Sequence, residues 1–341
     1  MFLGGKVDLL IDFCVRFISQ FQSTTLAFLI GGMLLAALKS KLSIPNAIYE
    51  FIVFMLLVKI GIEGGIEIRQ ANISAMLLPA LISSFVGVAI VLSSTFFFSF
   101  ISSVKKVDGI ATAGLFGAVS ASTLAVAMVA LEEQSISFEA WVPALYPFMD
   151  IPALILAIVL ANIYLNKENK GEKKEIQIWS IVKNSLRGSA LSALIFGLLI
   201  GLLTKSEGVL HSFYGPLFKG FLSILMLIMG MEAYSRINEL RKVAHWFMFY
   251  AIFFPILNGL MAFGLGYIAY ASVGFSPGGV ILLSVIAASN SDISGPPTLR
   301  GGIPSANPST YLGASTSLGT PVAIVICIPL FIALGKIVFD I

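Results

Sequence analysis

The sequence has few charged residues for its length. Lysine, arginine, aspartate and glutamate make up 11% of its 341 residues, whereas 57% are apolar. A soluble domain averages about 25% charged residues. The charges that are present cluster between long apolar runs, which excludes a soluble core with one membrane anchor. The composition therefore predicts an all-α polytopic membrane protein.

Cysteine and histidine are also scarce, with two of each. Cys14 and Cys327 stand in apolar stretches near opposite ends of the chain, which gives no metal-binding spacing and no disulfide framework. His211 and His245 lie outside the apolar runs, so neither is placed to be the base of an intramembrane serine protease. The net charge of +3 is too small to favour nucleic acid as a partner. We therefore expect no enzyme, no cofactor and no nucleic-acid partner.

Ten apolar runs are long enough, or nearly long enough, to cross a membrane as helices, which takes about 20 residues each. They cover residues 22–38, 46–63, 74–101, 109–131, 141–165, 187–204, 216–235, 243–272, 277–299 and 315–339. Basic residues concentrate in the loops after the first, third, fifth and seventh runs. Such loops face the cytoplasm, so we expect both termini to lie on the extracytoplasmic side.

The ten runs divide into two halves. We assign residues 1–21 to an amphipathic N-terminal helix, 22–165 to a first five-helix repeat, 166–186 to a cytoplasmic hydrophilic linker and 187–341 to a second five-helix repeat. Five spans is an odd number, so the second half must enter the membrane inverted. Inverted repeats are typical of secondary transporters.

The halves match without gaps at an offset of 169 positions. The matching pairs are Ser23 and Ser192, Gly32 and Gly201, Gly61 and Gly230, Glu63 and Glu232, Ser120 and Ser289, Ser122 and Ser291, and Pro152 and Pro321. Each pair alone is weak, because glycine and serine are common. Several pairs at one offset, within polar stretches of apolar runs, favour a true repeat.

The fourth run contains the first of two polar, helix-breaking stretches. A break there would free backbone N–H groups at the positive end of a half-helix, which attracts an oxyanion. The predicted anion-binding residues are Gly117, Ala118, Val119, Ser120, Ser122 and Thr123. The alternative is that these small residues only permit tight helix packing, with hydroxyls bonded to their own helix.

The ninth run contains the second stretch, which adds a carboxylate. An ionisable residue within a span, here Asp292, is costly and suggests function. Ser289, Asn290 and Ser291 surround it with the oxygen atoms that a hard cation such as Na⁺ prefers. We expect the break to continue through 295–297 and expose backbone carbonyls. The alternative is that Asp292 only caps the following segment.

Three further residues are secondary candidates for the site: Asp150, Ser294 and Thr320. Asp150 precedes Pro152 in the fifth run and could be either a second cation ligand or a local cap. We expect Na⁺ to be the only metal bound. An anion channel, or a sodium-coupled carrier of a small organic acid, remains an alternative reading of the same residues.

Four long runs resemble the cyanobacterial high-affinity sodium-dependent bicarbonate transporter family. They are GLFGAVSAST (114–123), ALYPFMDIPALILAIVLANIYLNK (144–167), LSILMLIMGMEAYSRINELRKVA (222–244) and AASNSDISGPPTLRGGIPSANPS (287–309). The similarity covers essentially the whole chain. At 120–122 this sequence reads Ser-Ala-Ser where the family commonly has Ser-Gly-Ser, which stiffens the break but keeps both hydroxyls.

The resemblance implies symport of bicarbonate with Na⁺ across the plasma membrane, in support of inorganic carbon concentration. It further implies a homotrimer that works by an elevator mechanism, with a gate unit of helices 1, 2, 6 and 7 and a core unit of helices 3–5 and 8–10. A cytoplasmic PII-like protein that binds adenine nucleotides regulates members of the family. The linker at 166–186 is short here, so the resemblance supports that partner less strongly than it supports transport.

Overall fold

A computed structural model of the chain describes residues 24–70, 73–168, 186–235, 245–293 and 295–341, together with 179 and 183. Within these residues all regular structure is helical. The predicted N-terminal helix at 1–21, most of the linker at 166–186 and Ser294 lie outside the described residues.

Within the described residues, the first half contains four α-helices before its interruption and two after it. In chain order they are α2 (Thr24–Ala37), α3 (Asn46–Gln70), α4 (Ile73–Ser99), α5 (Lys106–Gly117), α6 (Ala121–Glu133), the 3-10 turn η2 (Val142–Leu145) and α7 (Tyr146–Glu168). The helix α7 runs on through Pro152 without a break.

The second half has the same kind of elements and ends in a segment with π-helical turns. They are α9 (Ser189–Leu203), α10 (Glu207–Val209), η3 (Leu210–Tyr214), α11 (Gly215–Ser235), α13 (His245–Val273), α14 (Pro277–Ala288), α15 (Gly295–Gly302), α16 (Pro308–Ala314), η4 (Ser315–Gly319), α17 (Thr320–Val322), η5 (Ala323–Cys327) and α18 (Ile328–Phe339).

Among the described residues, six helical stretches are long and apolar enough to cross a membrane. They are Ser74–Ser99, Lys106–Glu133, Val142–Lys167, Glu207–Glu232, His245–Val273 and Pro308–Phe339. Three more predicted spans are apolar but short, and correspond to α2, α9 and α14. The predicted span at 46–63 lies in α3, a 25-residue helix that carries Glu50, Lys59 and Glu63. The chain is thus a polytopic helical membrane protein, and ten crossings remain a prediction.

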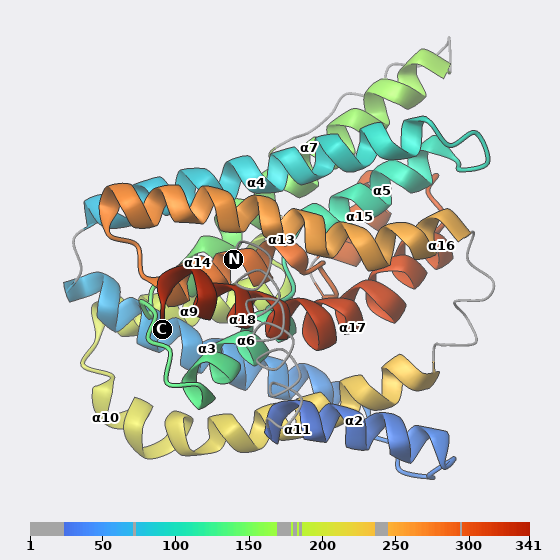
Figure 1. Cartoon of the computed structure of the whole chain (residues 1–341). Helices are drawn as coiled ribbons and strands as arrows, with labels where there is room; N and C mark the ends of the chain where they lie inside the picture. The colour runs from blue at the N-terminus through green and yellow to red at the C-terminus, as the bar shows by residue number, and fades with distance from the viewer. Residues whose placement is uncertain are drawn as a thin grey trace, which may run out of the picture.

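The helices form two adjoining groups (Figure 1). In one, α2 packs along α11 and α3 packs along α9. In the other, α4 packs against α5, α7 and α13, and α14 packs against α13 and α18. In Figure 1, α2 and α11 lie together at the lower edge, while α4 and α13 lie near the upper edge. The interrupted helices lie between these edges, in the interior.

Glycines allow the close approach in the first group. A Cβ on Gly201 would collide with the carbonyl group of Ile62, and a Cβ on Gly32 would collide with that of Leu227. Helices in membranes associate through such small residues, because lipid gives them no hydrophobic driving force to pack.

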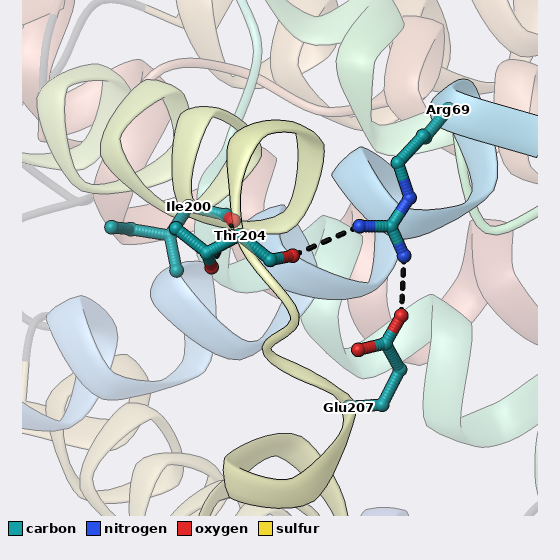
Figure 2. A network of polar contacts seen from close by, with 4 residues as sticks. All are labelled: Arg69, Ile200, Thr204 and Glu207. Carbon is teal, nitrogen blue, oxygen red and sulfur yellow. Dashed lines mark hydrogen bonds and ion pairs between the residues drawn. The ribbon is translucent and has the colours of Figure 1, made fainter.

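A polar cluster at one end of α3 adds to this packing (Figure 2). Arg69 donates from Nη1 to the carbonyl oxygen of Thr204 at 2.9 Å and pairs through Nη2 with Glu207. Thr204 in turn donates from Oγ1 to the carbonyl oxygen of Ile200 at 2.6 Å. The cluster therefore joins the end of α3 to the turn between α9 and α10.

The Gly/Pro-rich stretch after the second break differs from expectation. We expected the break to continue through 295–297, but these residues begin α15. Proline is tolerated in the first turn of a helix, where N–H groups have no intrahelical acceptor. Pro308 begins α16 in the same way.

Candidate functional site

The first break separates α5 from α6. The helix α5 ends at Gly117, and Ala118 and Ser120 have extended backbone conformations before α6 begins at Ala121. The Oγ of Ser120 accepts a hydrogen bond from Thr123 N at 3.1 Å, so Ser120 is the N-cap of α6. Serine is among the preferred N-cap residues, which explains why the second half-helix starts here. The break lies within the predicted stretch 117–123.

The second break separates α14 from α15, and its described residues are 289–293. Ser289 has an extended conformation and donates from Oγ to the carbonyl oxygen of Ile286 at 2.7 Å. The Oγ of Ser291 accepts from Gly295 N at 2.7 Å. Ser291 therefore satisfies the first N–H group of α15, and Asp292 is left to interact elsewhere.

The two breaks are hydrogen-bonded to each other. The three bonds run from Ser120 N to Ser289 Oγ (3.0 Å), from Ser122 Oγ to Asp292 Oδ2 (2.6 Å) and from Ser291 N to Leu115 O (2.8 Å). Ser120 and Ser289 are 169 positions apart, the offset at which the halves match. Residues from both halves of the chain therefore form one site.

Asp150 joins this site from α7. Its side chain is fully buried, and its Oδ1 accepts a hydrogen bond from Val119 N, inside the first break, at 3.0 Å. The carboxylate thus binds a backbone N–H that the break has freed, rather than a group of its own helix. Its other oxygen, Oδ2, has no hydrogen-bond partner among the described residues.

Asn290 and Thr320 also lie together, in the second half. We assign the Asn290 amide so that its nitrogen donates to Ser315 O (3.1 Å) and Thr320 Oγ1 (2.9 Å), and its oxygen accepts from Thr320 N (3.0 Å). This orientation satisfies both amide atoms. Gly319 makes room for them, because a Cβ there would lie about 2.7 Å from the end of the Asn290 amide group. Asn290 therefore holds the break against the π-helical segment.

The two half-helices that follow the breaks offer different numbers of donors. The N–H groups of Ala121 and Ser122 lie in the first turn of α6 and have no intrahelical acceptor. In α15 the corresponding turn contains Pro296 and Pro297, which have no N–H. The positive end of α6 is therefore the better anion site.

Three buried oxygen atoms at the breaks have no hydrogen-bond partner within the described part of the chain. They are Asp292 Oδ1, Asp150 Oδ2 and Thr123 Oγ1. Asp292 as a whole is partly exposed, although its Oδ1 is shielded. Carboxylate and hydroxyl oxygens of this kind are ligands that hard cations prefer. The residues present therefore fit a cation such as Na⁺ as a transported substrate.

The structure also brings to the site a residue that the sequence did not indicate. Tyr49, near the start of α3, donates from its hydroxyl to Asp292 Oδ2 at 3.4 Å. The two residues are 243 positions apart, and no repeat match or motif connects them. Tyr49 links the group of helices that contains α3 to the second break.

Together these features define a polytopic helical membrane protein with a buried polar site between two interrupted helices. The sequence profile of the Na⁺-dependent bicarbonate transporter superfamily matches residues 24–336. The chain therefore belongs to this superfamily, which confirms the resemblance seen in the sequence and places it among transporters rather than enzymes. No individual curated protein matches the chain.

Proposed function

We propose that this protein is a symporter that imports bicarbonate together with Na⁺, and that the two helix breaks form one site for both ions. Membership of a Na⁺-dependent bicarbonate transporter superfamily supports the choice of substrates. The observation that carries the proposal is the direct hydrogen bonding between the breaks, through Ser120 with Ser289 and Ser122 with Asp292.

Bicarbonate binds at the N-terminus of α6 in this proposal. The free N–H groups of Ala121 and Ser122 and the hydroxyl group of Thr123 can donate to an oxyanion there. The Ser122 hydroxyl group, which donates to Asp292 in the structure, would turn to the anion when it binds. Prolines remove the corresponding donors from α15, which supports this choice of end. Gly117, Ala118 and Val119 shape the backbone before the site, and Val119 positions Asp150.

Na⁺ binds on the side of the second break. Asp292 supplies the charge, with oxygen atoms from Ser289, Asn290 and Ser291 nearby in sequence and Asp150 as the second carboxylate. Opposite unit charges about 4 Å apart attract by about 4 kcal/mol at an effective dielectric constant of about 20. Each ion therefore stabilises the binding of the other.

The inverted repeat and its ten helices are part of the proposal. Their support is a set of contacts that recur when the offset is applied. Gly32 on α2 meets Met231 on α11, and its match Gly201 on α9 meets Ile62 on α3, the match of Met231. Similarly, Gly61 meets Leu198, and its match Gly230 meets Leu29, the match of Leu198. A twofold relation between inverted halves produces this reciprocal pattern.

The same grouping supports the proposal of an elevator mechanism. The helices α2, α3, α9 and α11 would form the gate unit, and α4–α7 with α13–α18 the core unit that carries both breaks. The resemblance of the sequence adds five further parts to this proposal. They are the plasma-membrane location, the outward-facing termini, the homotrimer, the role in carbon concentration and a PII-like regulator.

Uptake of labelled bicarbonate into proteoliposomes tests the function. We expect uptake to require an inward Na⁺ gradient and to stop when K⁺ replaces Na⁺. Uptake that ignores Na⁺ would favour an anion channel. Na⁺-dependent uptake of a small carboxylate in preference to bicarbonate would favour an organic-acid carrier.

A further inference from the structure

A groove lies where one end of α4, the start of α5 and the end of α7 meet, away from the helix breaks. It has a cavity volume of about 190 Å³. Its lining residues are Thr95, Phe98, Ser99, Lys106, Ile110, Leu160, Ile163, Tyr164 and Lys167. Most of its walls are apolar side chains, while its two charged residues are both lysines.

The two lysines give the groove a positive charge. Both side chains are exposed, and Lys106 Nζ lies 5.8 Å from the centre of the Tyr164 ring. In the part of the chain that the structure describes, neither lysine pairs with a carboxylate within 4 Å. The groove therefore combines an apolar channel with ammonium groups available to an anion.

A third polar group points to a ligand. The Oγ1 of Thr95 is buried and has no hydrogen-bond partner among the described residues. Its neighbour Ser99 is different, because its Oγ donates to the carbonyl oxygen of Phe96 at 2.7 Å. Thr95 thus adds a hydroxyl donor within the groove.

The surface beside the groove has the character of one that meets lipid. Phe96 and Phe100 on the adjoining turn of α4 are 65% and 72% exposed. A soluble partner would leave such side chains in water, whereas the acyl region of a bilayer covers them. The lysines stand at the helix ends, where ammonium groups reach the headgroup region.

We propose that this groove binds an anionic phospholipid, with an acyl chain along Phe98, Ile110 and Leu160 and the phosphate group at Lys106 and Lys167. Basic pockets between transmembrane helices recognise anionic headgroups in this way. The proposal does not depend on which ions the protein transports. A free phosphate ion shares the headgroup chemistry, but it makes no use of the apolar walls.

The test measures lipid binding to the delipidated full-length protein in detergent by native mass spectrometry. The probes are dioleoylphosphatidylglycerol and dioleoylphosphatidylcholine, which have the same chains but differ in net charge. We expect the anionic lipid to bind more tightly. Replacing both groove lysines, Lys106→Gln with Lys167→Gln, should weaken its binding roughly 25-fold, since each lysine near an anionic lipid contributes roughly a factor of five.

The matched control replaces Lys105 and Lys219 by glutamine. Both are exposed and outside the groove, so the net charge changes equally while binding should stay within about twofold of wild type. Equal affinity for the two lipids, or equal losses in the two double variants, would overturn the proposal.

A second variant tests the apolar part independently. Ile163→Trp enlarges a lining side chain, whereas Ile268→Trp enlarges an exposed side chain on α13. We expect only the first to reduce binding of the anionic lipid. Displacement of that lipid by inorganic phosphate at millimolar concentration, or no effect of Ile163→Trp, would show a simple anion site and refute a lipid site.

Discussion

Replacing Asp292 by asparagine is the sharpest perturbation of the proposed cation site. The substitution keeps the size of the side chain and removes its charge. In the structure Asp292 Oδ2 accepts from Ser122 Oγ at 2.6 Å and from the Tyr49 hydroxyl at 3.4 Å, while Oδ1 has no partner among the described residues. An asparagine oxygen can keep the contact with Ser122, so the framework of the site should persist.

The expected loss follows from the charge. A carboxylate and Na⁺ about 4 Å apart attract by about 4 kcal/mol at an effective dielectric constant of about 20. The dipole of the asparagine side chain and rearrangement of the surrounding site recover part of this energy. We therefore expect Asp292→Asn to raise the Na⁺ dissociation constant by at least about tenfold, the factor that corresponds to about 1.4 kcal/mol.

The melting temperature of the purified protein in detergent reports the Na⁺ dissociation constant without a transport assay. A ligand that binds only the folded state raises stability by RT ln(1 + [L]/Kd), so the Na⁺ concentration that raises the melting temperature reports Kd. Choline replaces Na⁺ to hold ionic strength constant. The expected result is a shift of the Na⁺ titration to higher concentration in the variant.

The control is Asp108→Asn. Asp108 is a buried carboxylate on α5 whose Oδ1 accepts from Asn307 N at 2.7 Å, away from the second break. This variant should lower the melting temperature without changing the Na⁺ titration. An unchanged Na⁺ titration in Asp292→Asn would refute the assigned role of Asp292.

Two further substitutions test the anion site and the packing. Ser122→Ala should weaken bicarbonate binding about tenfold, since a hydrogen bond to a charged group contributes about 1.5–3 kcal/mol; isothermal titration measures it. Its control is Ser83→Ala, because Ser83 is a buried serine that bonds within its own helix. Loss of membrane insertion in Ser122→Ala would favour the interpretation that this serine serves only helix packing. Gly201→Ala should lower the stability of the folded protein by about 1–3 kcal/mol, because the new methyl group collides with Ile62. Its control is Gly31→Ala, which places the methyl group in open space and should leave the melting temperature unchanged. Equal effects of the two substitutions would contradict this packing.

The sequence predicted the positions of the breaks because a helix break depends on residues that are neighbours in the chain. Serine and glycine within an apolar run mark positions where the backbone can leave the helix, and Ser120 then caps the next half-helix. The offset of 169 also connects Ser120 with Ser289, which are hydrogen-bonded in the structure.

The sequence could not predict contacts that depend on tertiary packing. Tyr49 approaches Asp292 across 243 positions, and nothing in its local sequence distinguishes it from a tyrosine at the membrane interface. The length of the second break was also misjudged. Composition shows the prolines at 296 and 297, but only the structure shows that they stand in the first turn of α15, where they are tolerated.

The central claim is that the two breaks hold bicarbonate and Na⁺ in one site, so the binding of the two ions must be coupled. The most direct measurement is the bicarbonate dissociation constant of the purified protein, with and without saturating Na⁺ at constant ionic strength. We expect Na⁺ to lower this constant by at least about tenfold, and bicarbonate to lower the Na⁺ dissociation constant by the same factor. A bicarbonate affinity that does not change with Na⁺ would contradict it.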